Sequence, residues 1–293
     1  MNCSACPNRA IFTSPTYCKE HFIAYIESKI TATIKQFNLI DPNEKIAVAV
    51  SGGKDSLTTL YMLHKLCKNV TAISIDEGIP GYRDQTLEDM KTFCEQYDIP
   101  HEIHSFKDNY NTTLTAMLDK GAPSCRSCGV MRRHVLNKAA QKFDKLATGH
   151  NLDDECQNFM MNLLKGNLLL CAMLGPTTGI TKRKGFTQRI KPLYLCTEKE
   201  IATYAFVKNF PIHFKECPHA ELGLRSKVRD ALNALESQQS GSKRKIVKYF
   251  LSILPALKES YISHDGPSMC TNCGQPSQKN ICNACKTEAA YAN

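Results

Sequence analysis

The chain has 293 residues, of which 42% are hydrophobic and 22% charged, and it carries a formal net charge of +9 and 15 cysteines. This composition is that of an ordinary globular protein, and no segment approaches the roughly 20 consecutive apolar residues of a membrane-spanning helix. The N-terminus is unlike a secretory signal peptide, so we expect a cytoplasmic protein with reduced thiols. The basic charge favours a polyanionic partner, and the cysteines indicate metal binding or catalysis rather than disulfides.

The first motif in chain order is a group of three cysteines and one histidine. Cys3 and Cys6 form a C-x-x-C pair, and Cys18 and His21 form a C-x-x-H pair eleven residues later. Two close pairs of this kind predict a closed tetrahedral zinc site, which we place in a zinc-finger module over 1–24. Apolar residues then recur at helical spacing, so we expect an amphipathic linker helix within 25–44.

From residue 45 the sequence predicts alternating strands and helices. The expected strands are Ile46–Val50, Val70–Ile75, His101–Phe106, Lys145–Thr148 and Arg189–Tyr194. The expected helices are Ser56–Leu66, Gln85–Tyr97, Gly129–Phe143, Asp154–Leu164 and Glu198–Phe210, followed by helices over 224–236 and 242–260. Such alternation is typical of an α/β fold with a doubly wound, Rossmann-like parallel sheet and helices on both faces. We therefore predict one α/β domain over 45–263.

The hexapeptide SGGKDS at 51–56 connects the first of these strands to the first helix. Its glycines allow a tight turn with accessible backbone N–H groups, and the N-terminus of the following helix attracts anions. The spacing differs from that of the Walker A motif. The pattern predicts a phosphate site, with a chance glycine-rich turn as the alternative. Its residues are Ser51, Gly52, Gly53, Lys54, Asp55 and Ser56.

Polar residues also follow two other predicted strands. Asp76 begins the run D-E-G after the second strand, and T-G-H-N at 148–151 follows the fourth. Because ligands of parallel sheets bind at the carboxyl ends of the strands, we expect these residues to complete one nucleotide site. Asp153 and Asp154 come directly afterwards, and carboxylates are ligands that suit Mg²⁺.

A third group of cysteines has only three members. Cys125 and Cys128 form a C-x-x-C pair, and Cys217 lies far along the chain beside a proline. Three thiolates cannot close a tetrahedral zinc site, but they can ligate three irons of a 4Fe-4S cluster and leave the fourth iron open. Arg126, Arg132 and Arg133 are expected to lower the thiol pKa values. Redox-active or persulfide-carrying cysteines, or unrelated core cysteines, are the alternatives.

The last motif consists of two C-x-x-C pairs separated by eight residues, formed by Cys270, Cys273, Cys282 and Cys285. It predicts a second structural zinc site, in a zinc ribbon over 264–293. Redox pairs are the alternative for both terminal groups. Closed sites of this kind fold short segments, and we expect these two to contact nucleic acid. The basic runs at 182–191 and 243–248 also suit phosphate contacts.

Together these motifs resemble those of the tRNA 2-thiouridine synthetases of the NcsA and TtuA type and of the cytosolic tRNA thiolation subunits, which are PP-loop ATP pyrophosphatases. The resemblance covers nearly the whole chain. It includes the N-terminal group, SGGKDS at 51–56, DEGIPGYRD at 76–84, CRSCGVMRR at 125–133, TGHNLDDE at 148–155, ECP at 216–218 and the C-terminal double C-x-x-C.

The resemblance implies an ATP-dependent tRNA uridine 2-sulfurtransferase, in which the uridine C2 oxygen attacks the α-phosphate of ATP and sulfide on the open iron then displaces AMP. It implies that ATP or Mg²⁺ is bound by residues 51–56 and by Asp76, Gly149, His150, Asn151 and Asp154. It assigns catalytic roles to Cys125, Cys128, Cys217, Lys54, Asp55, Arg132, Asp153 and Asp154. The implied partners are tRNA, ATP and either a ubiquitin-like sulfur carrier or free sulfide, with no membrane, and the resemblance is compatible with a homodimer.

The family modifies either the anticodon wobble uridine or a T-loop uridine. DEGIPGYRD and CGVMRR are more similar to the wobble branch, so we expect the wobble uridine as substrate. Arg132 stands where the T-loop branch commonly has a lysine, and arginine keeps the positive charge but cannot transfer a proton. The alternatives are T-loop thiolation, a persulfide-based thiolase, another PP-loop ATPase such as a lysidine synthetase, and a tRNA-binding zinc-ribbon scaffold.

Overall fold

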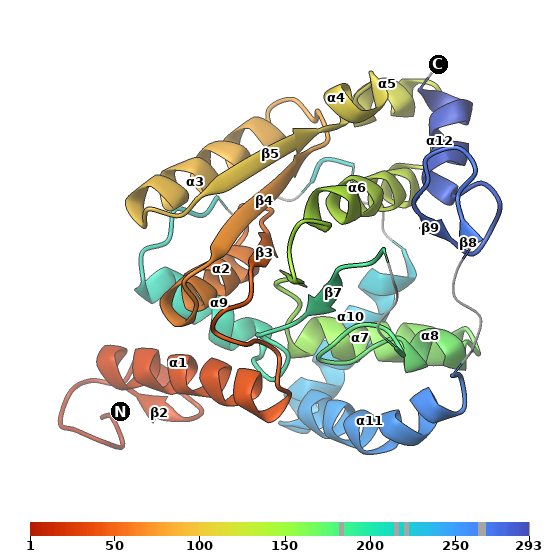
Figure 1. Cartoon of the computed structure of the whole chain (residues 1–293). Helices are drawn as coiled ribbons and strands as arrows, with labels where there is room; N and C mark the ends of the chain where they lie inside the picture. The colour runs from red at the N-terminus through yellow and green to blue at the C-terminus, as the bar shows by residue number, and fades with distance from the viewer. Residues whose placement is uncertain (182–184, 214–216, 220–222, 263–267, 293) are drawn as a thin grey trace.

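The computed structural model describes residues 1–181, 185–213, 217–219, 223–262 and 268–292. Within these ranges a five-stranded sheet forms the centre of the molecule (Figure 1). Its strands are β3 (Ile46–Ala49), β4 (Val70–Asp76), β5 (His101–Ser105), β6 (Lys145–Ala147) and β7 (Gln188–Ile190). Each neighbouring pair is parallel, which confirms the predicted parallel α/β sheet.

The strand order, β5-β4-β3-β6-β7, brings two of the sequence motifs together. The chain runs outward from β3 through β4 to β5 and then returns to the other side of β3 with β6 and β7. The sheet therefore changes direction between β3 and β6, and ligands of open α/β sheets bind at such a switch point. SGGKDS follows β3, and T-G-H-N follows β6.

Helices cover both faces of the sheet. One face carries α2 (Lys54–Leu66), α3 (Arg83–Gln96) and α9 (Glu198–Val207), and the other carries α4 (Phe106–Tyr110), α5 (Leu114–Asp119) and α6 (Ser124–Ala140). Side chains of β3 alternate between the two cores, with Ile46 and Val48 in the first and Ala47 in the second. This alternation follows from the pleat of a strand that is buried on both sides.

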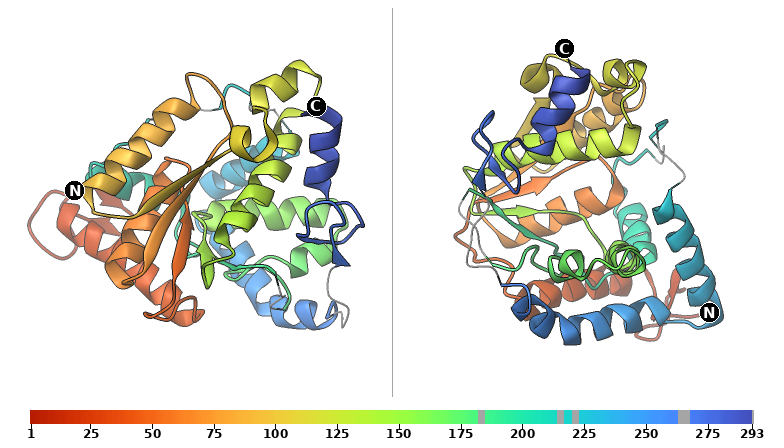
Figure 2. Two further views of the ribbon diagram at one scale, coloured as in Figure 1. Left: turned by 45° about the horizontal axis from the view of Figure 1, so that its top comes forward. Right: turned by 90° about the vertical axis from the view of Figure 1, so that its right-hand side faces the viewer.

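A second group of helices packs together at one side of the sheet (Figure 2). It comprises α7 (Leu152–Leu164), α8 (Leu168–Ala172), α10 (Leu224–Gln238) and α11 (Ser242–Glu259). Cys156 of α7 is buried in a small apolar cluster with Tyr194. Phe159 of α7 is buried in a second cluster with Phe250 of α11. None of the helices in the described part of the chain combines the length and apolarity that a bilayer span requires.

The two ends of the chain form small elements of their own. The N-terminal segment contains the hairpin of β1 (Phe12–Thr13) and β2 (Thr16–Tyr17), followed by α1 (Lys19–Gln36). The C-terminal segment contains the hairpin of β8 (Ser268–Met269) and β9 (Pro276–Ser277), followed by α12 (Asn283–Tyr291). In Figure 1 the C-terminal segment lies beside α6, whereas the N-terminal segment lies beside α9.

The short helices α4, α5 and α8 were not predicted, and three of the predicted elements differ most from the structure. The helix expected within 25–44 begins at Lys19, and its residues Phe22, Ile26 and Ile30 are fully buried in the same core as β3 and α9. The strand expected over 189–194 ends at Ile190, because Pro192 cannot donate a ladder hydrogen bond. The helix expected from residue 129 begins at Ser124, so the C-x-x-C pair lies in its first two turns.

Candidate active site

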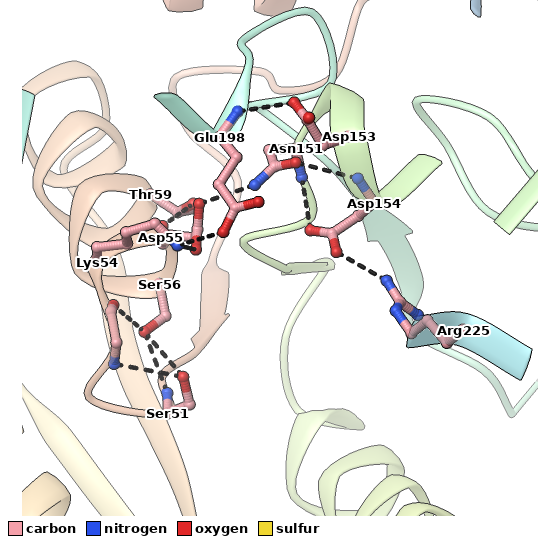
Figure 3. A network of polar contacts seen from close by, with 11 residues as sticks. Ser51, Lys54, Asp55, Ser56, Thr59, Asn151, Asp153, Asp154, Glu198 and Arg225 are labelled. Carbon is pink, nitrogen blue, oxygen red and sulfur yellow. Dashed lines mark hydrogen bonds and ion pairs between the residues drawn. The ribbon is translucent and has the colours of Figure 1, made fainter. Parts of the chain in front are cut away.

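The hexapeptide folds into a tight loop over the start of α2 (Figure 3). Gly52 has a φ of +86°, and a Cβ there would overlap the carbonyl oxygen of Thr86, so only glycine fits. The backbone N–H of Ser51 donates to the Ser56 hydroxyl over 3.2 Å, and that hydroxyl donates to the Gly53 carbonyl over 2.8 Å. No side chain caps α2. The first turn therefore keeps the uncapped N–H groups that an anion requires.

Lys54 lies beside two carboxylates. Its Nζ is 2.9 Å from Asp55 Oδ2 and 3.2 Å from Glu198 Oε1. Burial alone would lower the pKa of Lys54, but the two carboxylates outweigh it and raise the pKa. Burial raises the pKa of Asp55, against the opposing effect of Lys54. The loop thus holds a charged ammonium group next to the helix N-terminus.

The T-G-H-N segment touches this loop directly. A Cβ on Gly149 would lie 2.8 Å from the backbone carbon of Asp55, so the two loops approach more closely than a side chain allows. Asn151 Nδ2 donates to Asp55 Oδ1 over 3.0 Å. The Asn151 Oδ1 accepts from the Asp154 N–H over 3.1 Å and caps α7. One amide side chain therefore fixes the loop over 51–56, the predicted phosphate loop, relative to α7.

The two neighbouring aspartates of α7 have different surroundings. Asp154 Oδ1 pairs with Arg225 of α10 over 2.7 Å, and burial raises its pKa. Asp153 is buried, and its Oδ1 lies 2.5 Å from Lys243 Nζ while its Oδ2 accepts from the Glu198 N–H over 2.8 Å. Asp153 is thus held by α11 and α9 and its side chain is only 9% exposed, whereas Asp154 is 30% exposed and its Oδ2 accepts from the Asn151 N–H over 3.2 Å (Figure 3).

His150 and Asp76 lie at the ends of β6 and β4. His150 Nδ1 is 3.0 Å from the Thr148 hydroxyl. Burial, together with Lys191 and other cations, lowers the pKa of His150 to about 4, so the ring is neutral near pH 7. Asp76 Oδ1 accepts from the Gly78 N–H over 2.8 Å and shapes the turn after β4.

A buried ion pair joins this turn to the phosphate loop. Glu77 lies 3.1 Å from Arg83 Nε and 3.6 Å from Arg132 Nη1. Arg83 Nη1 in turn donates to the carbonyl of Ser51 over 2.8 Å. The sequence prediction did not include Glu77, Arg83, Glu198 or Arg225 among the site residues, although DEGIPGYRD contains the first two. Arg132, by contrast, was expected in the site. It is linked to the phosphate loop by its ion pair with Glu77, which in turn pairs with Arg83.

The three-cysteine group gathers at the start of α6. Cys125 is exposed, and Cys128 and Cys217 are half-buried. The carbonyl of His219 accepts from the Ser124 hydroxyl over 3.0 Å and lies 3.7 Å from Cys125 Sγ, which holds residues 217–219 against the helix. Burial raises the pKa of Cys128 to about 11, with the charges of Cys217 and Cys125 adding to it.

The expectation that arginines lower the thiol pKa values is therefore corrected for Cys128. Arg132 does lower the pKa of this thiol, but burial is the larger effect. Among the described residues, only the two terminal groups have all their ligand atoms within 4.8 Å of one another. Cys125, Cys128 and Cys217 do not form such a group.

The terminal groups are arranged as metal sites. In the first, Cys18 Sγ lies 3.2 Å from His21 Nδ1 and 3.7 Å from Cys6 Sγ, and Cys3 Sγ is 3.6 Å from His21 Nδ1. In the second, Cys270 and Cys285 are 3.9 Å apart and Cys273 and Cys282 are 3.8 Å apart. Each group converges four nitrogen or sulfur ligands on one point, as a tetrahedral ion requires.

The second terminal group also contacts α6. His134 Nε2 lies 3.4 Å from Cys273 Sγ, and its Nδ1 lies 2.6 Å from the hydroxyl of Tyr110. When Tyr110 donates to Nδ1, the proton of the neutral ring is on Nε2 and points to the sulfur. The helix that begins with Cys125 and Cys128 thus carries the C-terminal segment on its flank (Figure 2).

The model of the PP-loop domain family matches residues 24–235. The tRNA-5-methyluridine(54) 2-sulfurtransferase of Pyrococcus horikoshii is 34% identical over 98% of this chain and 93% of its own length. The cytoplasmic tRNA 2-thiolation protein 1 of Oryza sativa is also 34% identical, over 92% of this chain and 75% of its own length.

A solved structure matches nearly the whole chain. It is that of the U34-tRNA thiolase NcsA from Methanococcus maripaludis with its 4Fe-4S cluster, at 35% identity and a TM-score of 0.84, over 99% of this chain and 96% of that one. These similarities cover the PP-loop domain and both terminal segments. The chain therefore belongs to the PP-loop family and, within it, to the tRNA 2-thiolation proteins.

Proposed function

We propose that this protein is an ATP-dependent tRNA uridine 2-sulfurtransferase. One observation carries the proposal: the phosphate loop and the helix that bears two of the three thiols are joined by a chain of contacts. Arg132, on the thiol helix, pairs with Glu77, Glu77 pairs with Arg83, and Arg83 donates to the carbonyl of Ser51. An activated uridine at the loop would lie near the sulfur site.

In the first step the uridine C2 oxygen attacks the α-phosphate of ATP, an O–P bond forms, and pyrophosphate leaves. The uncapped start of α2 and Lys54 stabilise the charge on the phosphates. Asp55 and Asp154 are the carboxylates that would hold Mg²⁺, because Asn151 donates to both, through its side-chain Nδ2 to Asp55 and through its backbone N–H to Asp154. For Asp153, whose oxygens face Lys243 and the Glu198 N–H, we propose a positioning role instead.

The second step replaces the C2 oxygen by sulfur: sulfide forms a bond to C2, the C–O bond breaks, and AMP leaves with the oxygen. A 4Fe-4S cluster ligated by Cys125, Cys128 and Cys217 would supply that sulfide at its open iron. Arg132, 3.6 Å from Glu77 and close to Cys128, keeps a positive charge beside the thiols. Since sulfide enters and oxygen leaves at the same oxidation level, the exchange needs no external oxidant or reductant.

The finer features of the proposal follow the resemblance. The wobble uridine is the proposed substrate, supported by DEGIPGYRD, CGVMRR and Arg132, and the T-loop uridine is the alternative because the Pyrococcus relative is about equally similar. Zinc is proposed for both terminal groups. Sulfur would come from a ubiquitin-like carrier or free sulfide. The protein would act in the cytoplasm, and a homodimer fits the proposal.

The test uses two variants of protein prepared without oxygen. Cys217→Ser is expected to lose bound iron and thiolation but to keep the metal of both terminal groups, because Cys217 belongs to neither. Lys54→Ala is expected to keep its iron and to lose about 100-fold or more in thiolation rate, because it removes a charge on the phosphates. Iron, zinc and acid-labile sulfide are measured together with 2-thiouridine formed in a tRNA transcript.

The two variants separate the parts of the proposal. Unchanged iron in Cys217→Ser would contradict the three-thiolate site. Thiolation at the wild-type rate in Lys54→Ala would contradict the assignment of the phosphate loop. Mass spectrometry of tRNA fragments then shows which uridine carries the sulfur.

A further inference from the structure

Two arginines, one on the thiol helix and one on β7, form no ion pair within the described part of the chain. Arg133 belongs to α6 and Arg189 to β7, and neither forms an ion pair with any residue that the structure describes. Their cationic neighbours do: Arg132 pairs with Glu77, Lys191 with Glu155 and Arg225 with Asp154. The lack of an ion pair is unusual for Arg189, because its side chain is partly buried and buried charges are usually paired.

Arg189 contacts the thiol helix one turn away from Arg133, because its guanidinium group is hydrogen-bonded to Asn137. Arg133 and burial lower the pKa of Arg189, with burial the larger effect, to about 10, and burial and Arg132 lower that of Arg133. Arg189 Nη2 donates to Asn137 Oδ1 over 2.5 Å, which orients the group and leaves its other N–H groups available. Arg133 Nη1 lies 3.4 Å from the point that a Cβ of Gly129 would occupy, so this glycine makes room for the guanidinium.

The position of the pair is defined by its neighbours. Gly129 directly follows Cys128, so Arg133 lies beside the thiol pair. Arg189 acts electrostatically on His150 of the T-G-H-N segment, together with Lys191 and Arg225. The pair thus lies between the cysteines of the thiol helix and the T-G-H-N segment at 148–151. The charge of Glu155, the acid that also acts on His150, is already matched by Lys191 over 2.7 Å.

We propose that Arg133 and Arg189 together bind a backbone phosphate of the tRNA, next to the target uridine. This inference rests on the proposed function. Two guanidinium groups on adjoining elements, neither of them in an ion pair with a described residue, match the charge and the hydrogen-bonding needs of a phosphodiester. ATP phosphates have their own site at Lys54 and the start of α2. A phosphate contact positions the RNA without reading its sequence.

The test compares Arg133→Gln and Arg189→Gln with Arg229→Gln, an exposed arginine of α10 paired with Asp230. Binding of an unmodified tRNA transcript is measured at several salt concentrations, and ATP binding is measured separately. Each of the first two variants is expected to bind tRNA about tenfold more weakly. The plot of log K against log salt should also become less steep by roughly one unit, because one phosphate contact is lost. ATP affinity, and tRNA affinity of Arg229→Gln, should be unchanged.

Arg189→Lys serves as a second variant because it keeps the charge, and we expect it to retain the wild-type salt slope. Wild-type tRNA affinity in both glutamine variants would overturn the inference and leave the proposed function intact. A loss of ATP affinity without a loss of tRNA affinity would assign the pair to the nucleotide and also overturn it. Failure of the wild-type protein to bind tRNA would instead overturn the proposed function.

Discussion

Gly149 is the residue at which two parts of the site come closest. The absence of a side chain lets the T-G-H-N backbone lie against the backbone of Asp55, and Asn151 can then reach the Asp55 carboxylate over 3.0 Å. Backbone atoms cannot move aside as the end of a flexible side chain can. The close approach is therefore a requirement of the site rather than a matter of packing.

Gly149→Ala tests this requirement. A methyl group 2.8 Å from the Asp55 backbone must push the loops apart, and we expect a loss of about 1–3 kcal/mol in the free energy of unfolding, together with weaker ATP binding. Urea unfolding and calorimetric ATP titration provide the measurements. Gly223→Ala is the matched control, because a Cβ there meets no atom within 4 Å. Unaltered ATP binding by Gly149→Ala would show that the contact is dispensable.

At the scale of elements, one buried ion pair joins three helices. Asp153 of α7 binds Lys243 of α11, and its second oxygen accepts from the N–H of Glu198, the first residue of α9. The side chains of the pair are only 9% and 10% exposed. The N-terminus of α9, which also brings Glu198 to Lys54, is thus anchored to the helices beside the sheet.

Asp153→Ala leaves the buried charge of Lys243 without an anionic partner, with only the neutral Asn233 side chain still accepting from it, and we expect the change to cost about 3 kcal/mol of folding free energy. The double variant Asp153→Asn with Lys243→Met should recover much of this loss, because asparagine still accepts from Glu198 and methionine fills the space. Urea unfolding measures both. A fully stable Asp153→Ala that has lost Mg²⁺-dependent ATP turnover would instead identify Asp153 as a metal ligand.

Short sequence motifs predicted many of the site residues, whereas contacts between residues far apart in the sequence could not be predicted. SGGKDS, T-G-H-N and the terminal cysteine groups depend on short spacings, so their positions on the fold followed from the sequence. Asp153 could not be separated from Asp154 in this way, since its partner Lys243 is 90 residues away. The start of α6 was also missed, because C-x-x-C suggests a loop although here it lies within a helix. The basic residues at 182–184 and Glu216 of the ECP motif lie outside the described residues.

At the scale of the whole molecule, the C-terminal segment is attached to the helix that carries the thiol pair. Tyr110 of α4, His134 of α6 and Cys273 form a row of contacts of 2.6 and 3.4 Å. Burial, with the negative charges of Glu288 and the cysteines, raises the pKa of Tyr110, so its hydroxyl stays protonated as a donor. A hydrogen bond from His134 would orient the sulfur and neutralise part of its charge.

His134→Ala is expected to weaken metal binding by the C-terminal group about 10- to 100-fold, and to leave the N-terminal group unaffected. Metal release is followed in competition with a chelator, and a two-phase release distinguishes the groups. His104→Ala, which removes a histidine paired with Glu102 on β5, serves as the control. Identical release from His134→Ala and the wild-type protein would show that the contact has no effect on the metal.

The pairing of Lys54 with Asp55 and Glu198 has a consequence for the catalytic cycle. Because Asp55 and Glu198 neutralise the ammonium group, a triphosphate that binds at the loop would compete with these two carboxylates for Lys54. Asp55 and Glu198 would form their ion pairs with Lys54 again after the products leave. This competition would lower the affinity for ATP below that of an unpaired lysine, and it would favour the release of AMP and pyrophosphate for the same reason.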